Sequence, residues 1–285
     1  MNSPATQLKL AAFADEIANE LDVQIAHCRK NGVTHIELRG VAGKNVLDFD
    51  AALRKEIKQK LADNGLGISA IGSPIGKVRL DEPFDAHFDR FKIAVELAAY
   101  FQAPFIRLFS YYPAAGASHA DHIRGGRDEV LRRMQRQVDY VKNLPVVLVH
   151  ENESNLYAEK SAQCLDLFQS LNSPKLRCAF DFANFVLAGE NPLDNWRQLK
   201  PYTVHFHVKD ARAADGQCVP AGEGEGRIGE ILADAFASGY RGFLTLEPHL
   251  AVAGQFAGFT GPDLFKTAVD ALRKVCREKR IPLAS

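Results

Sequence analysis

Short runs of apolar and β-branched residues alternate with longer amphipathic segments along the whole chain. The short runs predict strands at residues 8–13, 34–38, 67–71, 105–109, 146–151, 177–181, 203–208 and 243–247. The amphipathic segments predict helices at residues 21–31, 51–64, 84–100, 127–143, 158–171, 192–199, 228–238 and 262–279. Strict alternation of this kind favours parallel strands joined by crossover helices.

The punctuation between these segments agrees with that order. Asn31-Gly32, Asn64-Gly65 and Ser238-Gly239 stand where a helix ends and a strand soon begins, which suits glycine in a left-handed cap. Residues 146–149 are apolar without alternation, as in a strand that is covered on both faces. The longest irregular segments, at 110–126, 209–227 and 248–261, all follow a strand and precede a helix.

An open, doubly wound sheet is the alternative arrangement of these units. Against it, the first strand is followed by Phe13-Ala14-Asp15-Glu16-Ile17 and not by a glycine-rich turn. Polar groups also follow many strands, where an open sheet would gather them at one switch point. We therefore expect a single α/β domain over residues 1–285, a (β/α)₈ TIM barrel, with the three long loops on its catalytic face.

The last four predicted strands end in Glu151, Asp181, His207 and Glu247. Because strand residues alternate between two faces, each of these is at or near the last inward position of its strand. Three carboxylates that lie so close need a counter-charge, and a divalent cation is the natural one. Oxygen ligands with one imidazole suit Mn²⁺, Mg²⁺ or Zn²⁺, so we expect one such ion per chain. The alternative is four unrelated polar residues held in ion pairs.

Four further charged side chains lie near the same end of the barrel. Lys209 shares the inward parity of His207 and is expected to bind a substrate oxygen or phosphate, or else to pair with a nearby carboxylate. Glu37 and Arg107 are expected to bind substrate, or else to neutralise one another inside the barrel. His205 lies one layer below His207, as a substrate contact or as a buried, hydrogen-bonded histidine.

Seven motifs together resemble the sugar phosphate isomerase/epimerase superfamily, the xylose isomerase-like barrels that also include endonuclease IV. The motifs are Phe13-Ala14-Asp15-Glu16-Ile17, His35-Ile36-Glu37-Leu38-Arg39-Gly40, His150-Glu151-Asn152-Glu153, Phe180-Asp181-Phe182-Ala183-Asn184-Phe185, His205-Phe206-His207-Val208-Lys209-Asp210-Ala211, Pro220-Ala221-Gly222-Glu223-Gly224 and Leu246-Glu247-Pro248-His249. The resemblance implies that Glu151, Asp181, His207 and Glu247 are the metal ligands. It also implies that Glu151 and Glu247 act as acid and base on opposite faces of the substrate.

Two positions modify what the resemblance implies about substrate. Ketose 3-epimerases of this superfamily usually place a substrate-binding histidine three residues after the metal aspartate, where this chain has Asn184. Related epimerases also contact substrate oxygens through an arginine in the loop that holds Arg212 here, although a solvated cation is the alternative. The third and fourth strands end without histidine, which argues against the trinuclear zinc site of endonuclease IV.

The expected chemistry is proton removal next to a carbonyl that chelates the metal together with an adjacent hydroxyl, giving an enediolate. Returning the proton to the other face gives an epimer, and returning it to the neighbouring carbon gives an isomer. Loss of a β-hydroxyl would instead make the protein a dehydratase of an inositol-like or keto-sugar substrate. We expect a sugar isomerase or epimerase, with the dehydratase as the alternative and a nuclease as the weaker one.

Composition narrows the range of partners. Thirty-five basic and 35 acidic residues balance, and no basic stripe suggests a nucleic-acid partner. Five cysteines in an odd number, without Cys-x-x-Cys, predict reduced and mostly buried thiols in the cytoplasm. No secretory signal and no membrane span are predicted. The expected partner is a small sugar-like molecule, and the expected assembly is a homodimer or homotetramer. The Gly222-Glu223-Gly224-Glu225-Gly226 segment is interpreted as a flexible loop, because its acidic residues repel phosphate.

Overall fold

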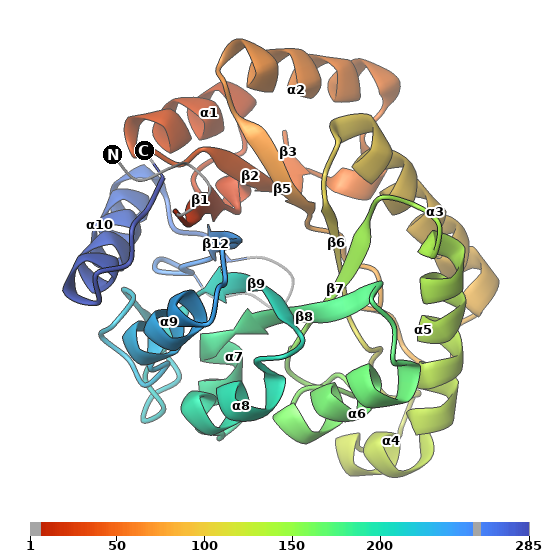
Figure 1. The fold of residues 1–285 in the computed structure, drawn as a ribbon. Coiled ribbons are helices and arrows are strands. Elements are labelled where there is room, and N and C mark those ends of the chain that lie inside the picture. The colour runs from red at the N-terminus through yellow and green to blue at the C-terminus, as the bar shows by residue number, and fades with distance from the viewer. Residues whose placement is uncertain (1–6, 253–257, 285) are drawn as a thin grey trace.

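A computed structural model describes residues 7–252 and 258–284 of the chain. Eight strands close into a parallel barrel in the order β1-β12-β9-β8-β7-β6-β5-β2, with helices around it (Figure 1). The barrel strands are β1 Lys9–Ala12, β2 His35–Leu38, β5 Gly67–Ile71, β6 Phe105–Leu108, β7 Val147–Glu151, β8 Leu176–Asp181, β9 Thr203–Val208 and β12 Phe243–Leu246. The expected (β/α)₈ TIM barrel is therefore confirmed.

Eight helices follow the predicted segments. They are α1 Leu21–Lys30, α2 Ala51–Asp63, α3 Phe84–Phe101, α5 Arg127–Val141, α6 Ser161–Leu171, α8 Pro192–Leu199, α9 Ile228–Ala237 and α10 Pro262–Glu278. Their ends differ from the predicted ends by three residues or fewer, most of all at the start of α6. Gly32, Gly65 and Gly239 have positive φ just after α1, α2 and α9, as the helix-end signals predict.

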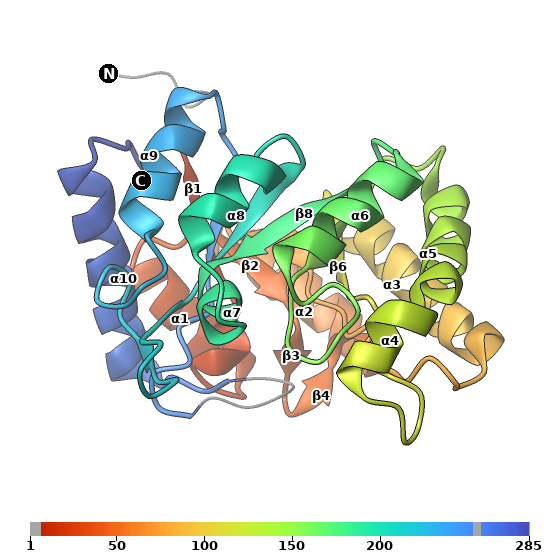
Figure 2. The same cartoon turned by 90° about the horizontal axis from the view of Figure 1, so that it is seen from below.

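The additional elements all follow the carboxyl ends of barrel strands. They are two short hairpins, β3 Gly40–Val41 with β4 Lys44–Asn45 and β10 Asp210–Ala211 with β11 Cys218–Val219, the helices α4 His119–Gly125 and α7 Phe182–Leu187, and the 3₁₀ turns Ala14–Glu16 and Val46–Asp48. Figure 2 shows α4, α7 and the β3–β4 hairpin gathered on the lower side of the barrel. The three long loops therefore lie on that side as expected, although the third includes residues 253–257, outside the described part of the chain.

The short helices could not be recognised from periodicity because each spans about two turns or less. Side-chain caps fix where they begin. Ser118 accepts a hydrogen bond from the Asp121 amide at the start of α4, and Asp181 accepts one from the Asn184 amide at the start of α7. The second cap involves an expected metal ligand, so α7 helps to orient that carboxylate.

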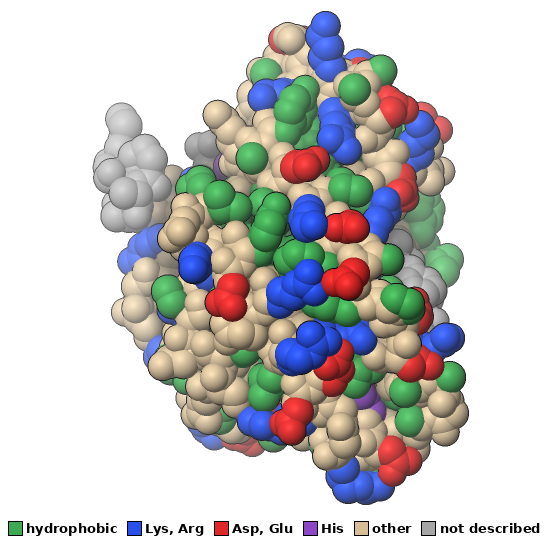
Figure 3. Space-filling model, turned by 90° about the vertical axis from the view of Figure 1, so that its right-hand side faces the viewer, with side chains coloured by type: hydrophobic (Ala, Val, Ile, Leu, Met, Phe, Trp, Pro, Cys, Tyr) green, Lys and Arg blue, Asp and Glu red, His purple; other side chains and the backbone are tan. Residues whose placement is uncertain are grey.

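The exposed charges are mixed in sign and the cysteines are free, as the composition predicts. On the face of α3 and α5, basic and acidic side chains are interleaved (Figure 3), with local pairs such as Arg136 with Asp85 and Lys92 with Asp89. All five cysteines are free, and all but Cys218 are buried. Within residues 7–252 and 258–284, no helix has the length and apolar character needed to cross a membrane.

Candidate metal centre

Four potential ligands meet at the carboxyl end of the barrel. Glu151, Asp181 and His207 lie near the ends of β7, β8 and β9, and Glu247 directly follows β12. Asp181 pairs in register with His207, and His207 with Thr245 of the next strand. One ligand atom from each of the four side chains lies within 4.8 Å of the others, and all four side chains are buried. The structure thus brings together the set expected from the strand ends.

The donor atoms of this cluster fit a divalent cation. Asp181 Oδ2, His207 Nδ1 and Glu247 Oε2 are buried and lack a well-formed hydrogen bond, although ion-pair contacts to Lys209 or Glu151 lie at 3.1–3.6 Å. Buried polar atoms are normally hydrogen-bonded, so three such atoms that lie together with ion-pair contacts alone are consistent with a site for a cation. Carboxylate oxygens and one imidazole nitrogen are suitable ligands for Mg²⁺, Mn²⁺ or Zn²⁺.

Glu37 supports the imidazole ligand from the opposite side. Its two carboxylate oxygens each lie 3.3 Å from His207 Nε2, and one of them lies 2.7 Å from His205 Nε2. His205 also contacts the Thr245 hydroxyl at 3.0 Å and is fully buried. A carboxylate on the outer nitrogen of a ligating histidine fixes the ring and its tautomer. Glu37 therefore orients the His207 ring, and His205 in turn contacts Glu37.

Arg107 contacts a ligand and not Glu37. Its Nη1 lies 3.0 Å from Glu151 Oε2 and 3.8 Å from Glu247 Oε1. The internal pair between Glu37 and Arg107, weighed above as an alternative, is thus replaced within the described chain by a Glu37 contact to two histidines and an Arg107 contact to Glu151.

Lys209 also belongs to the cluster. Its ammonium nitrogen lies 3.2 Å from Asp181 Oδ2 and 3.6 Å from Glu247 Oε2, and its side chain is 4% exposed. The neighbouring Asp210, an obvious partner by sequence, has a different role. Its carboxylate accepts hydrogen bonds from the amides of Gly222, Gly224 and Gly226.

That contact orders the glycine-rich segment, which the sequence suggested was a flexible loop. A Cβ at Gly224 would lie 2.3 Å from the Ala211 carbonyl oxygen, and one at Gly226 would lie 2.7 Å from Asp210 Oδ1. Glycine is therefore required there for close approach to the buried carboxylate. The hydrogen bonds to Asp210 therefore determine the conformation of residues 222–226.

The charges of the cluster shift the pKa values of its members in opposite directions. Burial opposes the charge of Glu151, but His207 and Arg107 outweigh it and lower the Glu151 pKa to about 2. Burial raises the pKa of Asp181 to about 7. Burial opposes protonation of His207, yet Glu151 and Glu37 raise its pKa to about 10. Since a ligating imidazole must be neutral, binding a cation here requires release of that proton.

Asn184 and Arg212, which were predicted to bind substrate, have other partners in the structure. Asn184 donates through its side-chain amide to the Asn152 carbonyl oxygen at 2.8 Å and is buried. Arg212 is 44% exposed and contacts Asp215 at 2.8 Å and Gln217 at 2.6 Å, within its own hairpin. Asn184 contacts a ligand candidate through its backbone amide, which caps Asp181, but no printed side-chain contact joins Asn184 or Arg212 to the four ligands. Substrate binding by either residue stays a prediction.

The sequence indicated that Arg39 ends the same strand as Glu37 and needs a charged partner, but it did not identify the partners. Its Nη1 lies 2.8 Å from Glu247 Oε1, its Nε lies 2.8 Å from Asp15 Oδ2, and its Nη2 lies 3.7 Å from Glu16 Oε1. Arg39 follows Glu37 by two residues, so alternation along the strand favours the same face for both side chains. No signal in the sequence indicated that Arg39 contacts Asp15 and Glu16. Nor did any signal indicate its contact with Glu247, which lies 208 positions away in the chain.

Glu16 ties the segment after β12 to this network. Its carboxylate accepts hydrogen bonds from the His249 amide at 3.0 Å and the Thr260 hydroxyl at 2.7 Å. His249 Nε2 lies 3.2 Å from Glu16 Oε1 and 3.6 Å from Glu247 Oε1. Glu16 therefore holds both His249 and Thr260, one at each end of the loop that follows β12, and His249 lies next to Glu247.

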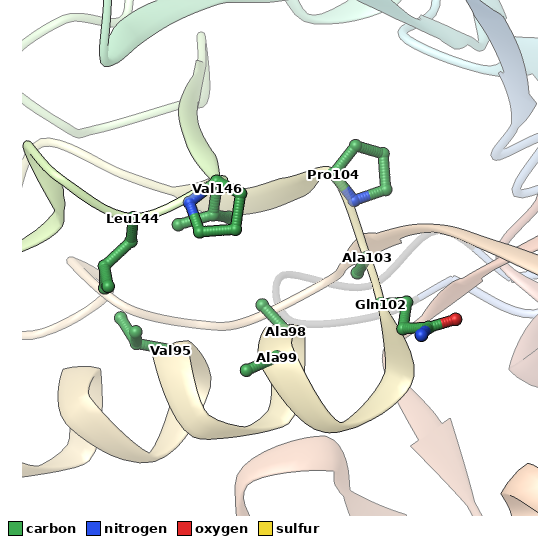
Figure 4. A pocket seen from close by; sticks show the side chains of 9 residues that line it. Val95, Ala98, Ala99, Gln102, Ala103, Pro104, Leu144 and Val146 are labelled. Atoms are coloured by element: carbon green, nitrogen blue, oxygen red, sulfur yellow. The ribbon is translucent and has the colours of Figure 1, made fainter.

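An apolar pocket of about 450 Å³ lies elsewhere, between the end of α3 and residues 144–146 (Figure 4). Its lining residues at 102–104 and 144–146 precede β6 and β7. They therefore lie at the amino ends of the strands, opposite the metal-ligand candidates. Gln102 is the one polar side chain in its lining, so the pocket lacks the groups for acid–base or metal chemistry.

Comparisons with known proteins found relatives in sequence and in fold. A curated 3-dehydroshikimate dehydratase from Bacillus anthracis is 25% identical over 193 residues, which are 68% of this chain and 66% of that protein, just under two thirds of its length. The crystal structure of a probable 3-DHS dehydratase involved in petrobactin synthesis in Bacillus anthracis has a TM-score of 0.72 at 21% identity, over 94% of this chain and 98% of that one.

Two further solved structures share the fold. A xylose isomerase-like TIM barrel protein from Mycobacterium smegmatis, in complex with magnesium, has a TM-score of 0.72 at 17% identity, over 98% of this chain and 99% of that one. A D-allulose 3-epimerase from Methylomonas sp., in complex with D-allulose, has a TM-score of 0.71 at 15% identity, over 95% and 97%. The family model described as a xylose isomerase-like TIM barrel matches residues 25–279. The chain belongs to the xylose isomerase-like TIM barrel family.

Proposed function

We propose that this protein is a divalent-metal-dependent enzyme that removes a proton next to the carbonyl of a small polyhydroxylated compound. The observation that carries the proposal is that one ligand atom from each of Glu151, Asp181, His207 and Glu247 lies within 4.8 Å of the others, with all four side chains buried. These four residues would hold the cation, which would polarise the substrate carbonyl and acidify the neighbouring C–H.

Glu151 and Glu247 are the proposed acid–base residues. Each has one oxygen held by an arginine, Glu151 Oε2 by Arg107 and Glu247 Oε1 by Arg39. The second oxygen of each faces the cluster, since Glu151 Oε1 lies 3.1 Å from His207 Nδ1 and Glu247 Oε2 lies 3.6 Å from Lys209 Nζ. A carboxylate oriented in this way can take up or return a proton at a substrate carbon within hydrogen-bond reach.

Dehydration is the overall reaction that we favour. Lys209 supports it, because an ammonium buried between Asp181 and Glu247 can donate a proton to a departing hydroxyl. The 3-dehydroshikimate dehydratase that is 25% identical supports it as well. Epimerisation is the second candidate, supported by two acid–base glutamates at one site, but Asn184 stands where ketose 3-epimerases usually have histidine.

A substrate panel in deuterated water tests the proposal. The protein is loaded with Mn²⁺, Mg²⁺ or Zn²⁺ and incubated with 3-dehydroshikimate, D-allulose and simple ketoses. Mass gain reports proton exchange next to the carbonyl when the proton returns to carbon, as in an epimer or isomer, and a new ultraviolet-absorbing, conjugated product with the mass of lost water reports dehydration. No exchange and no product with any metal and any member of the panel would count against the proposed chemistry.

A further inference from the structure

The ring of Phe13 contacts one metal-ligand candidate and two arginines that pair with two of the others. The guanidinium carbons of Arg39 and Arg107 lie over it, at 4.3 and 4.7 Å from the ring centroid. The imidazole of His207 meets it edge to face at 5.1 Å. Phe13 is fully buried. It directly follows β1, the first barrel strand in the chain, whereas Glu247 directly follows β12, the last one. One apolar side chain therefore contacts a ligand candidate and both arginines that hold the two glutamates.

The position of this ring is set by its surroundings. The Phe13 amide donates to the Leu246 carbonyl oxygen at 3.0 Å, next to Glu247 in the chain. On another side, a Cβ at Gly72 would lie 2.9 Å from Phe13 Cε1 and 3.1 Å from Arg39 Cβ. The absence of a side chain at Gly72 thus lets the ring and Arg39 come together at the end of β5.

A ring is suited to this place for an electrostatic reason. Two guanidinium groups beside a divalent cation repel both the cation and each other. The electron-rich face of an aromatic ring attracts cations, whereas an aliphatic side chain of similar volume only fills space. The two arginines determine which oxygen of Glu151 and of Glu247 is left to face the cluster.

We propose that Phe13 is a positioning residue of the metal centre, a shared platform that holds Arg39 and Arg107 so that each glutamate presents one oxygen to the cation. The proposal rests on the metal centre proposed above. It goes beyond that centre because it gives the residue after β1 a part in positioning the ligands. Phe13 acts through Arg39 and Arg107, and it would not touch the ion.

Cobalt binding tests this role without a known substrate. Metal-free protein is titrated with Co²⁺, and the affinity and the visible absorption spectrum are recorded for the wild type, Phe13→Leu and Phe91→Leu. Phe91 of α3 is the matched control: it is also fully buried, and its ring packs against Phe88 and Tyr140, away from the metal-ligand candidates. Phe13→Met, closer in volume to phenylalanine, provides a second variant if Phe13→Leu does not fold.

We expect Phe13→Leu and Phe13→Met to bind Co²⁺ about tenfold or more weakly than the wild type, with shifted absorption bands. Phe91→Leu should keep the wild-type spectrum and an affinity within about twofold. Wild-type affinity and spectrum in the Phe13 variants would overturn the positioning role alone. A wild type that binds no Co²⁺ would instead overturn the metal centre and the proposed function with it.

Discussion

Glu37 directs both of its carboxylate oxygens at the same nitrogen of His207, at 3.3 Å each. The other ring nitrogen, Nδ1, faces the cluster and lies 3.1 Å from Glu151 Oε1. The two residues come from β2 and β9, which are not neighbours in the barrel, so the contact crosses its interior. A negative charge behind Nε2 favours the tautomer whose lone pair points to the ligand cluster.

Replacing Glu37 by glutamine should therefore weaken binding of a divalent metal by about tenfold to a hundredfold. The amide of glutamine can donate to Nε2 and favour the wrong tautomer of His207. Calorimetric titration of the metal-free protein with Mn²⁺ measures the change. Glu129→Gln, which alters a surface carboxylate paired with Arg132 on α5, is the control and should bind as the wild type does. Equal affinities in the two variants would contradict the role given to Glu37.

Glu247→Gln should slow proton exchange at the carbon next to the substrate carbonyl by at least about a hundredfold, because the amide cannot accept the proton. Deuterium uptake measured by mass spectrometry reports this step directly. The exposed Glu223 on the loop after β11 offers a control, since Glu223→Gln leaves the cluster intact. Exchange near the wild-type rate in Glu247→Gln would refute its assignment as an acid–base residue.

The sequence was sufficient to predict the barrel because hydrophobic period and chain punctuation are local signals. It also placed Glu151, Asp181, His207 and Glu247 at one end, because parallel strands bring their carboxyl ends together. The partners of these residues were harder to predict. Arg107 pairs with Glu151 and Lys209 with Asp181 through side-chain rotamers and barrel stagger, which no single-strand pattern contains. The link from Glu16 to His249 depends on chain closure between β1 and β12.

Asp210→Ala should lower the free energy of unfolding by about 3 kcal/mol, since buried amides would lose a charged acceptor. Asp210 accepts from the amides of Ala211, Gly222, Gly224 and Gly226. Urea denaturation followed by circular dichroism gives the value. Asp215→Ala, at an exposed aspartate of the same hairpin loop, should cost less than about 1 kcal/mol. A comparable small loss at Asp210 would show that the loop does not depend on this carboxylate.

His87 should make the protein less stable in mild acid. Burial and the charge of Arg133 lower its pKa from 6.5 to about 4, and its Nε2 accepts a hydrogen bond from the Gly76 amide at 2.8 Å. Between these pH values the unfolded chain binds more protons at this residue than the folded chain does. This contribution to stability is therefore complete above pH 6.5 and is lost as the pH falls toward 4.

His87→Gln keeps an acceptor near the Gly76 amide but does not titrate. Its free energy of unfolding should fall less steeply than that of the wild type between pH 6.5 and pH 4, as measured by urea denaturation across this range. Parallel curves for the two proteins would show that His87 contributes nothing to the acid sensitivity.

Metal content per chain reports whether the four strand ends hold a cation. Wild-type protein and the double variant Asp181→Asn, His207→Asn are stripped with a chelator, equilibrated with Mn²⁺, separated from free ion and measured by elemental mass spectrometry. We expect close to one ion per wild-type chain and none retained by the double variant. An equal metal content in the two proteins, or no ion retained by the wild type, would contradict a cation held by the four strand ends.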